Sequence, residues 1–144
     1  MAVTIDGTSG ITTVGLTASG SASFVGLTAS GSASLVDTDV EGPLTGNVTA
    51  VAASDIDCSA GNYFVKTING ATTFTFSNVP TSGTSFGFTL ELTVTSGSAT
   101  WPAAVKWPND TAPTLGTGKT SLLIFITDDG GTRWRGASLV DYTT

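Results

Sequence analysis

The chain has 144 residues, a formal net charge of −6 and 11% charged residues, whereas soluble proteins average roughly 25% charged residues. Much of the remainder is Thr, Ser and Gly, a mixture that favours short strands and tight turns over helices. The length suits one domain with an appendage, and the five basic residues are too few and too scattered to form a nucleic-acid groove or a polybasic membrane face.

The residue types that are missing exclude several kinds of chemistry. Histidine is absent, which removes the commonest general base and zinc ligand. Cys58 is the single cysteine, so no disulfide can form within one chain. The first residues lack the basic and apolar regions of a secretory signal peptide, and no apolar run reaches the ~18 residues of a membrane span. We therefore expect synthesis in a cytoplasm, no membrane insertion and no cofactor.

The first part of the chain contains a tandem repeat. An eleven-residue unit from Val14 to Phe24 is followed at once by a copy from Val25 to Leu35, which differs only at its last residue. Each unit is mostly Gly, Ala, Ser and Thr. Ordering a backbone costs roughly 1–2 kcal/mol per residue, and so few apolar side chains do not offset that cost. We expect residues 1–45 to be ordered only by pairing, most simply with copies of themselves.

Residues 37–43 form the expected boundary between this repeat segment and a domain over residues 46–144. Asp37, Asp39 and Glu41 alternate, so in an extended chain their carboxylates share one face. One interpretation is a site for a hard cation such as calcium, which prefers carboxylate oxygens. The other is a solvated acidic face beside a turn at Gly42 and Pro43.

From Val48 onward the sequence predicts strands only. In residues 86–95, apolar side chains alternate with Gly, Thr and Glu, which is the pattern of a strand buried on one face. Short strands separated by turns over about 100 residues predict an all-β domain of sandwich or jelly-roll-like type. The predicted strands lie near residues 48–53, 61–68, 72–77, 86–95, 98–101, 121–127 and 132–140.

Turn residues divide these strands. Asn69-Gly70 predicts a hairpin with a primed turn between residues 64–68 and 72–76, and Asp128-Asp-Gly-Gly131 predicts a second hairpin. Prolines at 102, 108 and 113 mark residues 102–119 as a loop crossing between sheets. Within it, Gly116-Thr-Gly-Lys-Thr120 resembles part of a phosphate-binding loop, but an apolar strand follows instead of a helix, so we interpret it as a turn.

Two sets of side chains could carry chemistry. Asp110, Asp128 and Asp129 are the candidates for glycoside hydrolysis by paired carboxylates, although the last two lie in an expected turn, where Asp is common. Tryptophans 101, 107 and 134 could stack on sugar rings at an exposed tip. The alternative for the tryptophans is structural: the first two pin the crossing loop to the sheet, and the third lies inside the domain.

Several motifs follow one another between residues 60 and 136. They are Gly61-Asn-Tyr-Phe-Val-Lys-Thr-Ile-Asn-Gly70, Thr73-Phe-Thr-Phe-Ser-Asn-Val-Pro80, Thr89-Leu-Glu-Leu92, Trp101-Pro-Ala-Ala-Val-Lys-Trp-Pro108, Ala112-Pro-Thr114 and Asp128-Asp-Gly-Gly-Thr-Arg-Trp-Arg-Gly136. Together they resemble a β-domain of tailed-bacteriophage fibre and virion-surface proteins. Ile5-Asp-Gly-Thr-Ser-Gly-Ile11 and the Leu-Thr-Ala-Ser-Gly units are similar to the stalk segments of such fibres.

This resemblance implies a homotrimeric, non-enzymatic component of the virion surface, made in the cytoplasm of a bacterial host. Three copies of residues 1–45 would intertwine as a β-structured stalk, and residues 46–144 would form a β-sandwich head. The expected partners are further copies of the chain and other virion proteins, such as a major capsid protein or a tail or baseplate protein. The side chains expected to face the trimer axis are Val14, Leu16, Phe24, Val25, Leu27 and Leu35.

Three functions remain open from the sequence. The first is a capsid decoration protein or short head fibre. The second is a tail fibre or fibre tip that binds host surface glycans, for which Trp107 and Asp110 are the candidate ligand contacts. The third is a spike that degrades polysaccharide, although the sequence offers no clear carboxylate pair. We favour the first.

Overall fold

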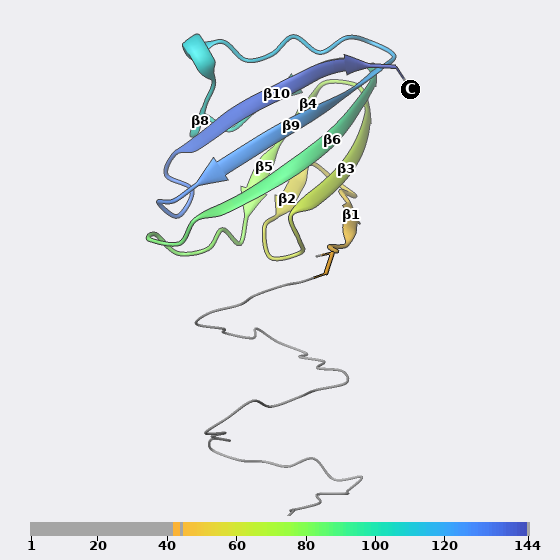
Figure 1. The fold of residues 1–144 in the computed structure, drawn as a ribbon. Coiled ribbons are helices and arrows are strands. Elements are labelled where there is room, and N and C mark those ends of the chain that lie inside the picture. The colour runs from red at the N-terminus through yellow and green to blue at the C-terminus, as the bar shows by residue number, and fades with distance from the viewer. Residues whose placement is uncertain (1–41, 44, 144) are drawn as a thin grey trace, which may run out of the picture. The chain divides into compact units, whose positions relative to one another are not determined.

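The computed structural model describes residues 42–43 and 45–143 and confirms the all-β class, since these residues form strands and one short 3-10 helix at Pro108–Asp110 but no α-helix (Figure 1). A six-stranded mixed sheet has the order β1-β3-β6-β9-β10-β8. Its strands are β1 (Val48–Ala50), β3 (Tyr63–Asn69), β6 (Phe86–Ser96), β9 (Lys119–Thr127), β10 (Trp134–Tyr142) and β8 (Val105–Lys106). Two smaller sheets pair β2 (Asp55–Asp57) with β5 (Thr75–Ser77), and β4 (Thr72–Thr73) with β7 (Ala99–Thr100).

The longest strand, β6, forms the middle of the large sheet. It pairs in parallel with β3 and antiparallel with β9. The predicted alternation is confirmed, because every second side chain from Phe88 to Val94 is buried and the residues between them are half-buried. A period of two places these two sets on opposite faces. One face of the sheet therefore belongs to the core, and the other points away from it.

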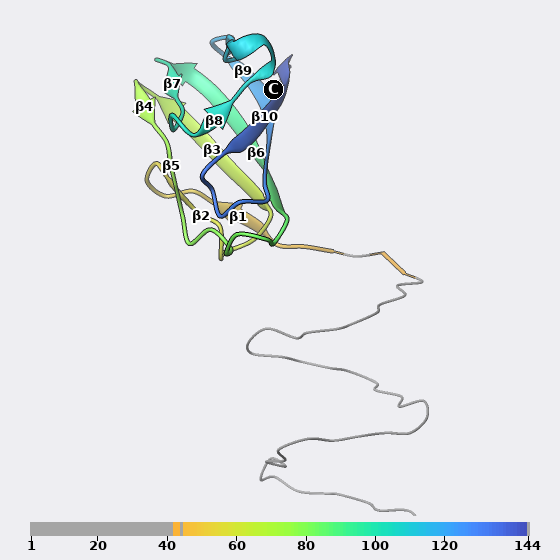
Figure 2. The same ribbon diagram turned by 90° about the vertical axis from the view of Figure 1, so that its left-hand side faces the viewer.

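The smaller sheets lie against the inner face of the large sheet (Figure 2). Aromatic rings fill the space between them, and Phe76 of β5 is the central one. Its ring meets Phe88, Phe125 and Trp134 edge to face, with a centroid distance of 5.1 Å in each case. Edge-to-face ring pairs add roughly 0.5–1.5 kcal/mol to the free energy gained by burying their area. This cluster holds the β2–β5 sheet to the large sheet.

The predicted hairpin at Asn69-Gly70 is wrong. The chain does turn there, but β3 and β4 lie in different sheets, and neither Asn69 nor Gly70 has the positive φ of a primed turn. The physical reason is that β1 and β6 already occupy both edges of β3, so β4 has no edge to pair with. The turn instead carries the chain from the large sheet to a smaller one.

Other boundaries also differ from the sequence prediction. The strand predicted over 72–77 is two short strands, β4 and β5, because Phe74 between them is buried and its N–H bonds to the carbonyl of Thr100. Strands β2 and β8 were not predicted. The second predicted hairpin is confirmed: β9 and β10 pair antiparallel across Asp128–Gly131, and both glycines there have positive φ. The Gly116–Thr120 segment is confirmed as a turn that leads into β9.

Two valines provide a matched test of the core. Val94 is 1% exposed and packs between the layers, whereas Val48 is 64% exposed. Val94→Ala removes buried methyl groups and leaves a cavity, so we expect it to lower the free energy of unfolding by about 2 kcal/mol. Val48→Ala should change it by less than about 0.5 kcal/mol. Urea unfolding followed by tryptophan fluorescence measures both, and equal effects would contradict the assigned core.

Gly97 tests the corner where β6 ends. Its φ is +82°, and a Cβ there would overlap the backbone carbonyl group of Gly70. Gly118 also has a positive φ, of +71°, but open space around it. Gly118→Ala should therefore cost only the backbone strain, about 1–2 kcal/mol, and Gly97→Ala should cost more because the turn must also move. The same unfolding measurement compares them, and the reverse order would show that the corner is placed wrongly.

Candidate interaction surface

The outward face of β9 has an unusual sequence for a sheet surface. Residues 122–126 are apolar without interruption. Leu123 and Phe125 point into the core and are fully buried, so the strand period places Leu122, Ile124 and Ile126 on the outer face. A continuous apolar run is typical of a strand covered on both faces. Within the described residues only the inner face is covered, and Ile124 is 37% and Ile126 48% exposed.

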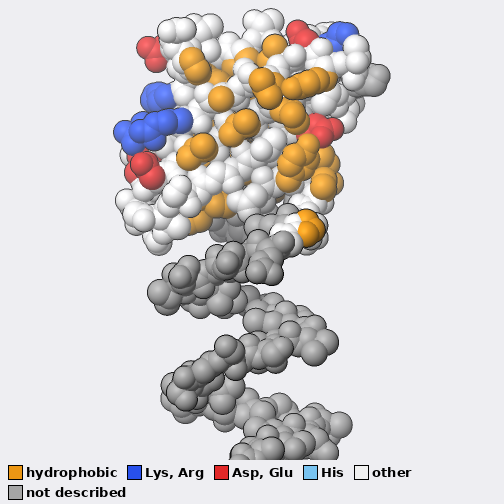
Figure 3. Space-filling model, in the orientation of Figure 1, with side chains coloured by type: hydrophobic (Ala, Val, Ile, Leu, Met, Phe, Trp, Pro, Cys, Tyr) orange, Lys and Arg blue, Asp and Glu red, His pale blue; other side chains and the backbone are white. Residues whose placement is uncertain are grey.

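The strand register divides the outer face into two halves. Ile124 lies between Thr89 of β6 and Ala137 of β10, and Leu122 lies between Glu91 and Leu139. The β9–β10 half is therefore apolar apart from Arg135, which lies opposite Ile126, whereas the β3–β6 half is mostly polar. Figure 3 shows hydrophobic side chains exposed on this face. We call the apolar half the outer strip; its residues are Leu122, Ile124, Ile126, Ala137 and Leu139.

The strip ends at an open sheet edge. Strand β10 pairs on its far side with β8, but only through Trp134 and Arg135. Over residues 136–142 no described strand occupies that side of β10. Leu139 and Val140, 53% and 43% exposed, stand at this edge. Open edges with apolar side chains promote association between chains, and folded proteins usually protect them.

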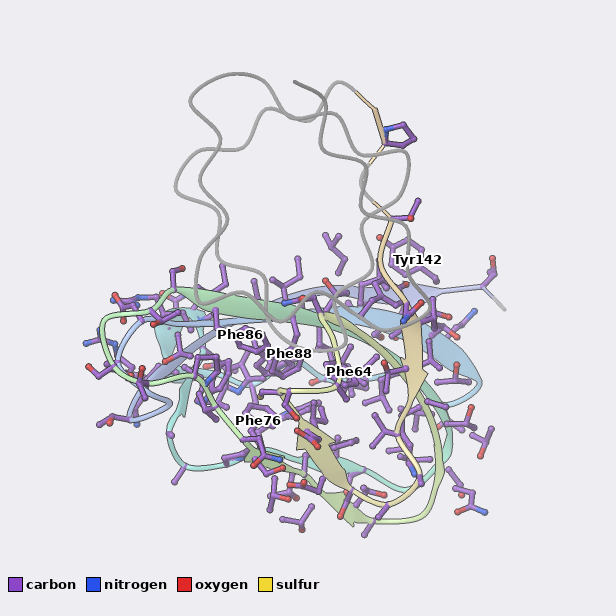
Figure 4. All side chains as sticks on the ribbon, turned by 90° about the horizontal axis from the view of Figure 1, so that it is seen from below. Phe64, Phe76, Phe86, Phe88 and Tyr142 are labelled. Atoms are coloured by element: carbon purple, nitrogen blue, oxygen red, sulfur yellow. The ribbon has the colours of Figure 1, made fainter. Side chains whose placement is uncertain are left out.

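A groove of about 560 Å³ lies at one end of the same face, lined by Tyr63, Glu91, Thr93, Thr120, Leu122, Tyr142 and Thr143. The Tyr63 hydroxyl donates a hydrogen bond of 2.7 Å to Oε2 of Glu91. The hydroxyl oxygens of Thr93 and Thr120 are also 2.7 Å apart. Figure 4 shows Tyr142 on the opposite side of the sheet from the core phenylalanines 64, 76, 86 and 88.

The hydrogen bond to Glu91 controls the ionisation of Tyr63. It raises the pKa of the phenol above its ordinary value, with smaller contributions from partial burial and from the negative charge of Glu91. The phenol therefore remains a donor over a wider pH range than an isolated tyrosine does. The polar half of the face thus contains a fixed donor–acceptor pair and no basic side chain in the groove lining.

Several other carboxylates of the described domain bond to its own turns and strands. Asp55 accepts hydrogen bonds from the hydroxyls of Thr75 and Ser77, which ties β2 to β5. Asp57 accepts bonds from the side chains of Ser59 and Asn78 and from the Ser59 backbone, and these bonds lower its pKa. Asp55 thus joins two strands, and Asp57 stabilises the turn that follows its own strand.

The hairpin acids have a similar role. Asp129 accepts the backbone N–H of Arg133 and the hydroxyl of Thr127, and the first of these bonds is the main cause of its lowered pKa. Asp128 pairs with Arg133 at 3.4 Å and with Arg135 at 3.7 Å. The hydrogen bonds and ion pairs of both acids therefore join the two ends of one turn.

The residues predicted from sequence as ligand contacts lie apart from the outer strip. Trp107 is half-buried, with its ring edge-on to Trp101 and Phe125 at 5.7 and 5.6 Å, and it lies over Gly136. Asp110 is exposed at the end of the 3-10 helix, and its N–H bonds to the carbonyl of Trp107. The tryptophans thus have the structural placement that we gave as the alternative, and Trp134 is 2% exposed.

Other predicted features either lie elsewhere or are not described. The axis candidates Val14, Leu16, Phe24, Val25, Leu27 and Leu35 and the acidic group Asp37, Asp39 and Glu41 lie outside the described residues. Cys58 is buried, and burial with the nearby charges of Asp57 and Asp55 raises its pKa to about 11. Among residues 42–43 and 45–143, no three Cys, Asp or Glu side chains are grouped closely enough to hold a metal ion.

The chain matches no known protein family, no curated protein and no solved structure. None of the described segments is a helix long and apolar enough to cross a membrane. The outer strip was not among the sequence-predicted sites, although the run Leu122–Ile126 carried the signal for it: a strand needs a cover on both faces when it does not alternate.

The Tyr63–Glu91 pair gives a test of the groove by pH titration. Glu91→Ala removes both the acceptor and the negative charge, so we expect the pKa of Tyr63 to fall towards its ordinary value. Ultraviolet absorbance of the tyrosinate measures this, with Tyr63→Phe identifying which transition belongs to Tyr63. An unchanged Tyr63 transition in Glu91→Ala would show that the two side chains do not meet.

Proposed function

We propose that this chain is a non-enzymatic structural protein of a tailed-bacteriophage virion, a homotrimer that projects from the particle as a capsid decoration protein or short head fibre. Residues 1–45 form its intertwined β-repeat stalk and attachment segment, and residues 46–144 its β-sandwich head. Its partners are other copies of the chain and a virion protein such as the major capsid protein.

The observation that carries an assembly function is the uncovered outer strip. Burying apolar surface contributes about 25 cal/mol per Å², and isoleucines on a sheet strand are normally placed where that burial occurs. Here two of them are more than one-third exposed beside an open sheet edge. A contiguous apolar surface of this kind supports a role in protein–protein contact. The tandem repeat in residues 14–35, which contains too few apolar side chains to fold alone, supports self-association independently.

The described geometry gives less support to the two alternatives. A fibre tip that binds glycans would use an exposed tryptophan face, whereas Trp107 packs on Trp101 and Phe125. A polysaccharide-degrading spike would use a pair of carboxylates facing one cleft. Asp128 and Asp129 instead form ion pairs and hydrogen bonds within their own hairpin.

The oligomeric state of the full chain tests the proposal. We expect native mass spectrometry of the purified protein to give three times the 14.4 kDa of one chain, because a single copy leaves the repeats without partners. Electron microscopy of virions carrying a tagged copy then separates capsid from tail. A monomer at micromolar concentration would contradict the trimer, and a tag on the tail tip would favour the fibre alternative.

A further inference from the structure

We propose that the outer strip is covered by the domain 46–144 of a second copy of this chain. The inference rests on the proposed function in one respect, that identical copies assemble. It goes further by naming the surface through which their C-terminal domains touch. No described residue of the chain itself lies over the strip.

The contrast between β6 and β9 locates the contact. Both strands bury their inner side chains in the core, but their outer side chains differ. Those of β9 are Leu and Ile. Those of β6 are typical of a solvated strand: Gly87, Thr89, Glu91 and Thr93. At one end, a Cβ on Gly87 would come within 3.3 Å of the Ile126 side chain, so the Ile126 side chain lies close to the backbone of β6. The pattern therefore indicates that a partner covers β9 and β10 and not the whole sheet.

The charges around the strip suit a copy of the same chain. The strip itself contains no ionisable side chain. At one end, Arg135 pairs with Asp128, and at the other Glu91 accepts a hydrogen bond from Tyr63. A partner selected by opposite charge would need unpaired charges around the strip. Instead, Arg135 has an ion-pair partner in its own domain, whereas the phenol bonded to Glu91 is neutral and leaves that negative charge in place. Because the strip between them is uncharged, a copy with the same net charge of −6 meets little repulsion there.

The open edge of β10 extends the same surface. Residues 136–142 have backbone groups without a described strand partner, directly beside Leu139. A copy that covers the strip also shields this edge, which removes water from the apolar side chains and from the strand edge together. One contact thus accounts for both exposed features of the β9–β10 half.

Thiol accessibility in the full chain tests the contact. In Ile126→Cys, purified with no other protein present, we expect a maleimide to react about tenfold more slowly than in Thr67→Cys, because a covered site reacts only when the contact opens. Thr67 is exposed on the β3 strand of the same face and serves as the matched control. The native Cys58 contributes little labelling, since it is buried and its pKa is about 11. Adding Ile124→Asp to Ile126→Cys should restore the rate of the control, with the circular dichroism spectrum unchanged.

The covering surface is identified by a photoactivatable phenylalanine analogue at position 126. A covalent dimer on a denaturing gel, with the cross-link inside residues 46–144 of the other chain, supports the proposal. A cross-link within one chain or to residues 1–45 overturns it. Rapid labelling of Ile126→Cys in a protein of trimer mass overturns this inference but leaves the proposed trimer standing, whereas a monomeric mass with rapid labelling overturns both. Slow labelling of Ile126→Cys in a monomeric protein would show that the chain covers its own strip, which would also overturn this inference.

Discussion

The contact between Phe76 and the rings of the large sheet is the interaction on which the rest of this domain depends. The smaller sheets have only two strands each, and strands of two or three residues do not persist without a surface to pack on. For the β2–β5 sheet, Phe76 provides the contact by packing against Phe88, Phe125 and Trp134 of the large sheet. Because the rings lie on one side of the large sheet, they also determine which of its faces is covered and which is exposed.

That choice of face explains the surface properties of the domain. Once Leu123 and Phe125 point inward, the strand period fixes Leu122, Ile124 and Ile126 outward. No rotation or one-residue slip of β9 can bury all five side chains against a single layer. The apolar strip is therefore built into the amino-acid order of β9, and only a second layer outside the described domain can cover it.

Local patterns in the sequence predicted the local features of the fold. The alternation from Phe86 to Thr95 and the turn at Asp128–Gly131 were sufficient for β6 and for the β9–β10 hairpin. The partners of β3 could not be predicted, because β1 and β6 pair with it in parallel and come from distant positions. Strands β2 and β8 have three and two residues, too few to show a period. The Tyr63–Glu91 pair likewise arises only from the register of β3 on β6, which brings together residues 28 positions apart.

The β9–β10 hairpin has a consequence for the order in which the molecule is made. Its strands are joined by a short turn, so it can form within microseconds, whereas the parallel pairing of β3 with β6 must wait for a much longer loop to close. In a complete chain that refolds, the apolar outer surface can thus form before the rest of the domain has condensed. During synthesis the order is reversed, because β9 and β10 follow every other strand along the chain and leave the ribosome last. Unfinished copies on one messenger therefore lack this surface, which delays their association until the hairpin has been made.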